Sequence, residues 1–81
     1  MTGHDFEREH AAFADALRCL REQRGMSREQ LAVWAGTSSS TVYRIERGES
    51  SPTFENMTSI ARVLGITLSQ LIAAAEGGDT Q

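Results

Sequence analysis

Arginine is the residue type whose abundance and placement in this chain most directly indicate chemistry. The sequence contains no lysine, and six of its eight basic residues fall between positions 18 and 47. Three glutamates share that stretch, so its formal charge is +3, whereas the segments before and after it each carry −3. A guanidinium presents paired N–H donors that match a phosphate group or the edge of guanine. We therefore expect an anionic partner to bind the middle third of the chain, although the net charge is −3.

Residues suited to catalysis or metal binding are few. His4 and His10 are the only histidines and Cys19 is the only cysteine, so there is no zinc ligand set and no internal disulfide. The sequence contains no recognisable Ser/His/Asp set and no glycine-rich phosphate loop. We expect no cofactor, no metal ion and no enzymatic activity. Cys19 lies among arginines that could activate a redox-sensing thiol, but we favour an inert, half-buried residue.

Glycines divide the sequence into segments of helical periodicity, and these segments must position the arginines. Glycine readily takes the left-handed conformation that follows a helix C-cap, and it recurs at positions 25, 36, 48 and 65. Ser and Thr residues at suitable N-cap positions precede the later segments. Five helices are predicted, the first over about 5–24 and the others from Ser27 to Gly36, from Ser38 to Gly48, from Thr53 to Gly65 and from Thr67 onward.

The pattern predicts an all-α protein, a compact five-helix bundle. No stretch alternates apolar and polar residues as a strand does, and Pro52 is the only proline. We expect a single domain over residues 1–81, with an ordered core over about 6–75. The sequence has no apolar run of the roughly 18 residues that a membrane span needs, and its N-terminus is polar and acidic. We therefore expect a cytoplasmic protein without a membrane partner.

The second and third predicted helices have the spacing of a helix-turn-helix over residues 28–47. Each is about two turns long, too short to be stable alone, so the two must pack on each other at a steep angle. A small residue at the crossing and a glycine in the turn permit this, and Ala32 and Gly36 occupy those positions. Leu31, Val42 and Ile45 supply inward-facing apolar side chains.

Residues 17–71 resemble the Cro/repressor-type DNA-binding domain, the XRE group of helix-turn-helix proteins. The resemblance is carried by the stretches RGMSREQLA, AGTS, VYRIERG, SPT and IARVLGITLSQL, in the order and at the spacings of that family. It covers about two-thirds of the chain. It implies a lambda-repressor-like fold and the binding of a double-stranded DNA operator by a dimer, as in bacterial and phage regulators.

The same resemblance implies a role for each exposed residue of the helix-turn-helix. The third predicted helix is the recognition helix, and its base-reading positions hold Ser39, Ser40, Tyr43 and Arg44. Arg44 can form a bidentate pair with guanine, and Tyr43 can stack on a thymine methyl group or bind a phosphate. The two serines discriminate little between bases.

Phosphate contacts and one structural ion pair are implied next. The candidate phosphate ligands are Arg28, Thr37, Thr41 and Arg47. Arg28 departs from the family, which frequently has glutamine at that position. Arg21 and Glu46 match an arginine and a glutamate that the family commonly pairs, and we expect a partly buried ion pair. Arg18 and Arg24 are expected to be solvated.

The last predicted helix has more apolar surface than its own core needs. We expect part of it to pair with a second copy, through Ile66, Leu68, Leu71, Ile72 and Ala75. Two-fold pairing would place two recognition helices about 34 Å apart, one helical turn of DNA. The leading hypothesis is thus a homodimeric transcriptional regulator that binds a palindromic operator.

Val33 and Trp34 support an alternative function. They fall on the outer side of the second predicted helix, where the family usually has polar residues. An exposed apolar pair would suit a protein partner, so the alternative is an antitoxin-like or adaptor module for which DNA binding is secondary. The other interpretation is that Trp34 folds over Phe6 or His10 of the first helix.

Overall fold

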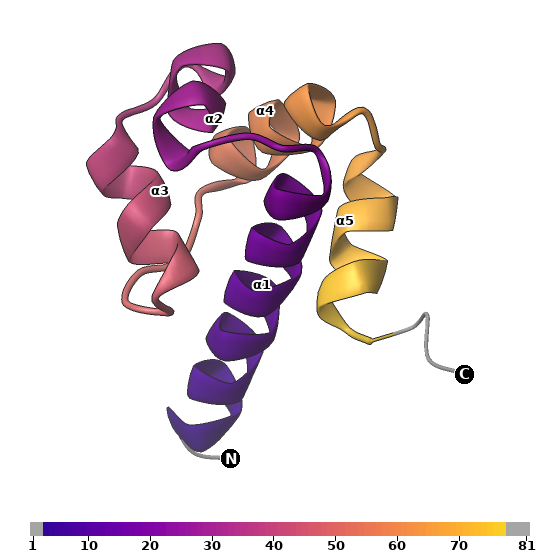
Figure 1. Ribbon diagram of the computed structural model, residues 1–81. Coiled ribbons are helices and arrows are strands. Elements are labelled where there is room, and N and C mark those ends of the chain that lie inside the picture. The colour runs from indigo at the N-terminus through magenta and orange to yellow at the C-terminus, as the bar shows by residue number, and fades with distance from the viewer. Residues whose placement is uncertain (1–2, 78–81) are drawn as a thin grey trace.

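The computed structural model describes residues 3–77, with side chains from residue 8 onward. This part of the chain forms five helices and no strand, and Figure 1 shows how the helices are arranged. The helices are α1 (Gly3–Gln23), α2 (Arg28–Ala35), α3 (Ser39–Glu46), α4 (Phe54–Leu64) and α5 (Leu68–Ala75). The prediction of an all-α, five-helix fold is confirmed, and α1 begins two residues before its expected start.

Local hydrogen bonds explain where the later helices begin. The side chains of Ser27, Ser38, Thr53 and Thr67 each accept a hydrogen bond from the backbone N–H three residues on. α2 and α5 each begin with a complete capping box, because the glutamine at that third position accepts a hydrogen bond from the backbone N–H of the capping residue. Such caps contribute about 1 kcal/mol each, which matters for helices of only two turns.

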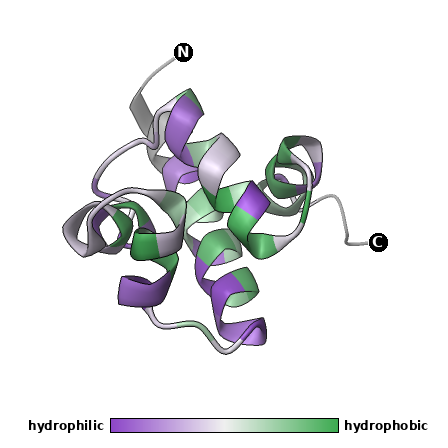
Figure 2. Cartoon of the chain, turned by 90° about the horizontal axis from the view of Figure 1, so that it is seen from above, coloured by the Kyte–Doolittle hydropathy of each residue, from purple (hydrophilic) through white to green (hydrophobic). Residues whose placement is uncertain are grey.

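The core forms between five pairs of packed helices. α1 packs against α3 and α5, α2 packs against α3 and α4, and α4 contacts α5 (Figure 1). In the view of Figure 2, hydrophobic and hydrophilic stretches alternate along the helices, as expected where one face of each is buried. Every helix supplies at least one fully buried side chain, and these are Leu17, Leu31, Val42, Ile45, Ile60 and Leu71.

α1, with 21 residues, is about as long as a bilayer core is thick but carries many charged residues, and the other helices are much shorter. No single helix within residues 3–77 is long and apolar enough to cross a membrane. Only α4 and α5 taken together reach that length and composition, and their axes meet at 99°.

Two expectations about exposed side chains are wrong. Trp34 is 62% exposed and is not folded down over α1, because α2 packs against α3 and α4 and its outer face has no helix above it. Of the two residues that Trp34 was expected to cover, Phe6 and His10, the side chain of Phe6 lies outside the described residues. Cys19 is exposed and not half-buried, since it lies off the side of α1 that faces the core.

Candidate nucleic-acid interface

The helix-turn-helix holds α3 with one face buried and the opposite face open. The turn between α2 and α3 is short because Gly36 takes the left-handed conformation, with φ 74°. The Thr37 N–H then donates a hydrogen bond to the Ala32 carbonyl at 2.9 Å. Val42 and Ile45 point inward and are buried by α1 and α2. The remaining side of α3 is therefore available to a partner.

That open side carries the predicted base-reading residues. Ser39, Ser40, Tyr43 and Arg44 are all exposed. The guanidinium of Arg44 has no hydrogen-bond or ion-pair partner among the side chains and carbonyls of the described part of the chain. All five of its N–H donors are consequently free for an external acceptor.

The predicted phosphate ligands fall into two groups. Arg28 and Arg47 are exposed cations at the first position of α2 and at the C-cap of α3. Thr37 and Thr41 are half-buried, and the Thr41 hydroxyl is 2.9 Å from the Ser38 hydroxyl at the start of α3. The starts of α2 and α3 meet at a shallow surface depression lined by Arg28, Glu29, Ser39, Ser40 and Tyr43.

The expected pair of Arg21 and Glu46 is present as a bidentate, buried ion pair. Arg21 Nε donates to Glu46 Oε2 at 2.6 Å, and Arg21 Nη2 donates to Glu46 Oε1 at 3.1 Å. Arg21 Nη1 also donates to the Met26 carbonyl at 2.7 Å. The hydrogen bond to Glu46 raises the pKa of Arg21 further above its ordinary alkaline value, against the opposing effect of burial. The pair joins α1 to α3 behind the open face.

Glu46 also connects this buried pair to the surface. Arg28 Nη1 donates to Glu46 Oε1 at 3.4 Å, so one carboxylate is shared by a buried and an exposed arginine. The Arg28 guanidinium lies over the Tyr43 ring, 5.2 Å from its centroid. Arg47 lies 5.4 Å from the same centroid.

Internal partners offset most of the positive charge of the middle third. Arg47 Nε donates to Glu49 at 2.7 Å, and this hydrogen bond raises the pKa of Arg47 above its ordinary value. Arg18 pairs with Asp15 at 2.9 Å. Formal charge by segment therefore overstates the positive field of this face, since neighbouring carboxylates lie within a few ångströms.

Sequence reasoning missed several contacts of the arginines, including the hydrogen bond from Arg28 to Glu46 and the pair of Arg18 with Asp15. Arg24, expected to be solvated, donates through Nε to the Leu64 carbonyl at 2.6 Å and so connects the end of α1 to the end of α4. Glu49 was not singled out as the partner of Arg47. The proximity of Tyr43 to Arg47 was legible, because residues four apart share one face of a helix.

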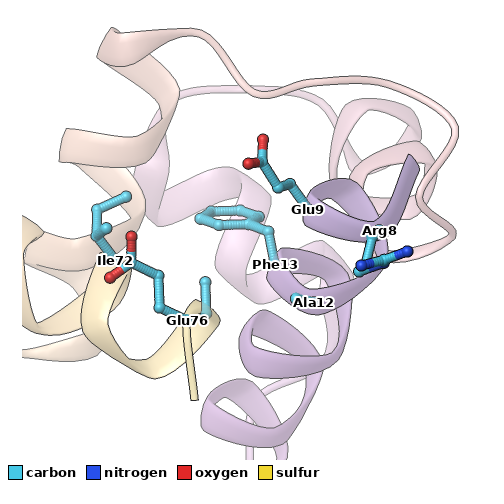
Figure 3. Close-up of a pocket in the computed structure, with 7 residues that line it drawn as sticks. Arg8, Glu9, Ala12, Phe13, Ile72 and Glu76 are labelled. Carbon is cyan, nitrogen blue, oxygen red and sulfur yellow. The ribbon is translucent and has the colours of Figure 1, made fainter. Parts of the chain in front are cut away.

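The predicted dimer residues lie in and beside α5. Leu71 is fully buried in the core of its own chain, so it cannot contribute to an exposed interface. Ile66, Leu68, Ile72 and Ala75 are half-buried. Ile72 and Ala75 line a groove between α5 and the first half of α1, whose floor includes Phe13 (Figure 3).

The chain resembles known helix-turn-helix proteins over most of its length. A family model described as a helix-turn-helix domain matches residues 12–74. The HTH-type transcriptional regulator SutR of Escherichia coli is 42% identical over 57 residues, which are 70% of this chain and 32% of that protein. The crystal structure of the restriction-modification controller protein C.AhdI from Aeromonas hydrophila superposes with a TM-score of 0.74 and 34% identity, over 76% of this chain and 94% of that one.

Units of this kind also occur within longer proteins. Hydroxypropylphosphonic acid epoxidase from S. wedmorenis matches with 35% identity and a TM-score of 0.67, over 75% of this chain and 32% of that one. The chain spans 32% to 58% of the length of the curated relatives that it matches. The similarity thus covers the helix-turn-helix unit that the relatives share with this chain.

Proposed function

Because the chain belongs to the Cro/repressor-type (XRE) family of helix-turn-helix proteins, we propose that it is a sequence-specific, double-stranded DNA-binding transcriptional regulator. In this proposal α3 enters the major groove, and α2 lies across the phosphate backbone with its N-terminus toward a phosphate. Similarity to the regulator SutR and to the controller protein C.AhdI supports a regulatory role without catalysis. Acting on DNA would place the protein in the cytoplasm of a bacterium.

The observation that carries this proposal is the open face of α3. The inner face of α3 is buried, and its open face presents four exposed residues, which are Ser39, Ser40, Tyr43 and Arg44. The two serines are small hydrogen-bond donors and acceptors, and Arg44 is a long, flexible donor. Arg44 is the exposed cation there without an internal partner among the described residues, and an unpaired guanidinium matches O6 and N7 of guanine. We assign Arg44 to base reading, and Arg28 and Arg47 to phosphates.

Selection of bound duplexes from a random pool tests the proposal directly. We expect a palindromic consensus that contains guanine in each half-site. Arg44→Ala should relax the preference at that guanine by about 5- to 150-fold, the equivalent of 1–3 kcal/mol. Arg28→Ala should instead weaken all duplexes to a similar extent.

Arg62 provides the matched control for loss of charge. It is an exposed arginine on α4, outside the helix-turn-helix, so Arg62→Ala removes the same charge without touching α2 or α3. The Arg62→Ala variant should bind each duplex about as tightly as the wild type does. Identical behaviour of all three variants in competition assays would contradict the assigned roles.

We further propose that the protein acts as a homodimer through the groove between α1 and α5. The groove has a volume of about 470 Å³ and an apolar floor, and Arg8, Glu9 and Glu76 lie at its edge (Figure 3). Opposite charges on one rim can pair across a two-fold axis, because each patch then faces a copy of itself. Light scattering at micromolar concentration should report a dimer.

A pair of variants checks this interface. Ile72→Glu would bury a carboxylate in the groove and should yield a monomer, since an unpaired buried charge costs several kcal/mol. Val33→Glu places the same charge on the exposed outer face of α2 and should leave the dimer intact. A wild-type protein that remains monomeric at all concentrations tested would exclude this interface.

Exposed apolar residues on α2 favour a second candidate function, an antitoxin-like or adaptor module. Val33 is 73% exposed and Trp34 is 62% exposed. Because tryptophan is usually largely buried and is enriched at protein interfaces, an exposed tryptophan points to a partner surface. Co-purification from the native cell distinguishes the two functions. A stoichiometric protein partner that is lost on Trp34→Ser would favour the adaptor, and its absence would favour the regulator alone.

A further inference from the structure

Tyr43 stands between two arginines that come from different parts of the helix-turn-helix. The Arg28 guanidinium lies over its ring at 5.2 Å from the centroid, and the Arg47 guanidinium at 5.4 Å. Both distances are within the roughly 6 Å at which the quadrupole of an aromatic ring attracts a cation. One side chain of α3 therefore contacts a cation from the start of α2 and a cation from its own C-cap.

Each arginine is held by a second group as well as by the ring. Arg47 Nη1 donates to the Tyr43 hydroxyl at 3.3 Å, and its Nε donates to Glu49. Arg28 donates to Glu46 at 3.4 Å. Contact with an aromatic face leaves the N–H donors along the guanidinium edge able to bind a second partner.

We propose that Tyr43 is a positioning residue, whose ring sets the spacing of Arg28 and Arg47 as a two-arginine clamp for the DNA backbone. Guanidinium groups over the ring occupy the surface that would otherwise stack on a thymine methyl group. When DNA binds, phosphates replace Glu46 and Glu49 as acceptors, while the ring holds the two cations in place. This inference rests on the proposed DNA-binding function and assigns Tyr43 to affinity for the backbone instead of base selection.

The experiment compares Tyr43→Leu and Tyr43→Phe with the wild-type chain on a selected duplex and on a random duplex, over a series of salt concentrations. Phenylalanine keeps the ring and removes only the hydroxyl that Arg47 contacts, whereas leucine removes the ring. Leucine should weaken both duplexes equally, by roughly 5- to 30-fold for each bound protomer. The slope of log K against log salt is negative, and its magnitude should fall by about 0.9 for each phosphate that the protein no longer neutralises. Phenylalanine should restore most of the affinity and of the slope.

Replacing thymine by uracil in the selected duplex removes the methyl groups and tests base reading separately. The wild type and Tyr43→Leu should lose the same amount of affinity, or none, on the uracil duplex. A methyl-dependent loss that is present in the wild type and absent from Tyr43→Leu would overturn the inference. So would a leucine variant that changes the selected consensus while its salt slope stays the same as that of the wild type.

Two further measurements keep the outcomes separate. Tyr43 is exposed, so thermal unfolding should show Tyr43→Leu less stable than Tyr43→Phe only by the two cation–π contacts. That difference is at most about 5- to 30-fold in the unfolding equilibrium constant, the equivalent of about 1–2 kcal/mol, and both variants should be folded at the assay temperature. If the wild type binds no duplex, the proposed function fails and this inference with it. If the wild type binds and leucine leaves the salt slope unchanged, only the inference fails.

Discussion

Glu46→Gln should severely destabilise the fold, because it leaves the charge of Arg21 buried without its counter-ion. The two side chains are 8% and 3% exposed, so water cannot solvate the guanidinium once the carboxylate is removed. Arg21 would keep neutral acceptors, the Met26 carbonyl and the amide oxygen of the introduced glutamine, and its nearest carboxylate would be that of exposed Glu22 at 3.9 Å. Removing one partner of a buried pair costs about 3–5 kcal/mol.

That destabilisation is large compared with the whole stability of a chain of this size. At about 0.05–0.15 kcal/mol per residue, the expected free energy of unfolding is roughly 4–12 kcal/mol. For a domain of this length each kcal/mol lowers the Tm by about 4–8 °C, so Glu46→Gln should lower it by at least about 12 °C. Urea titration followed by far-UV circular dichroism measures the change directly.

A second variant separates the ion pair from mere loss of packing. Arg21→Met combined with Glu46→Leu removes both charges and keeps side chains of similar volume, which is often neutral or stabilising. This double variant should be at least about 2 kcal/mol more stable than Glu46→Gln. Arg18→Met, which breaks the exposed pair with Asp15, is the control and should cost about 0–1 kcal/mol. A loss under about 1 kcal/mol for Glu46→Gln, or additive losses in the double variant, would refute the reasoning.

Three further predictions concern stability, and urea titration or thermal unfolding measures each. Leu17→Ala should cost about 2–5 kcal/mol, because Leu17 is fully buried on α1 where that helix crosses the core. Gly36→Ala should cost about 1–2 kcal/mol, because a Cβ at φ 74° strains the backbone although nothing lies within 4 Å of it. The raised pKa of Arg21 adds stability that is present at every pH below the unfolded pKa and lost only as the pH rises through the folded value. Between about pH 6 and 9 the difference between the wild type and the Arg21→Met/Glu46→Leu variant should therefore stay constant.

Much of the fold could be predicted from the sequence, because the signals involved act over a few residues. The hydroxyl of Ser27 caps α2 through a backbone N–H three residues away, and the Thr67 hydroxyl caps α5 in the same way. Glycine at position 36 ends α2 through its own backbone conformation. Helix-spaced apolar residues likewise identify the buried face without knowledge of what covers it. The exposed recognition residues follow from the same periodicity once the turn is located.

The partners of the charged groups could not be predicted in this way. Family resemblance supplied the pairing of Arg21 with Glu46, which are 25 residues apart. Nothing in the order of residues indicated that Arg28 would reach the same carboxylate, or that Arg24 would reach the carbonyl of Leu64. Leu71 was expected at a dimer contact and is buried in its own core instead, because its position depends on how α5 packs against α1 and α4 and not on its sequence neighbours.

The sequence by itself therefore determined the helices, their ends, the crossing of α2 with α3 and the side of α3 that stays exposed. Tertiary structure decided the long-range partners, such as Glu46 for Arg28 and the Leu64 carbonyl for Arg24. The physical reason is range: a capping hydrogen bond joins neighbours along the chain, whereas an ion pair or a cation–π contact requires two segments to approach within about 4–6 Å. That approach depends on how α1 crosses α3 and how α2 lies against it. Tyr43 illustrates the difference, since its exposure and its proximity to Arg47 follow from periodicity, whereas its contact with Arg28 follows from packing.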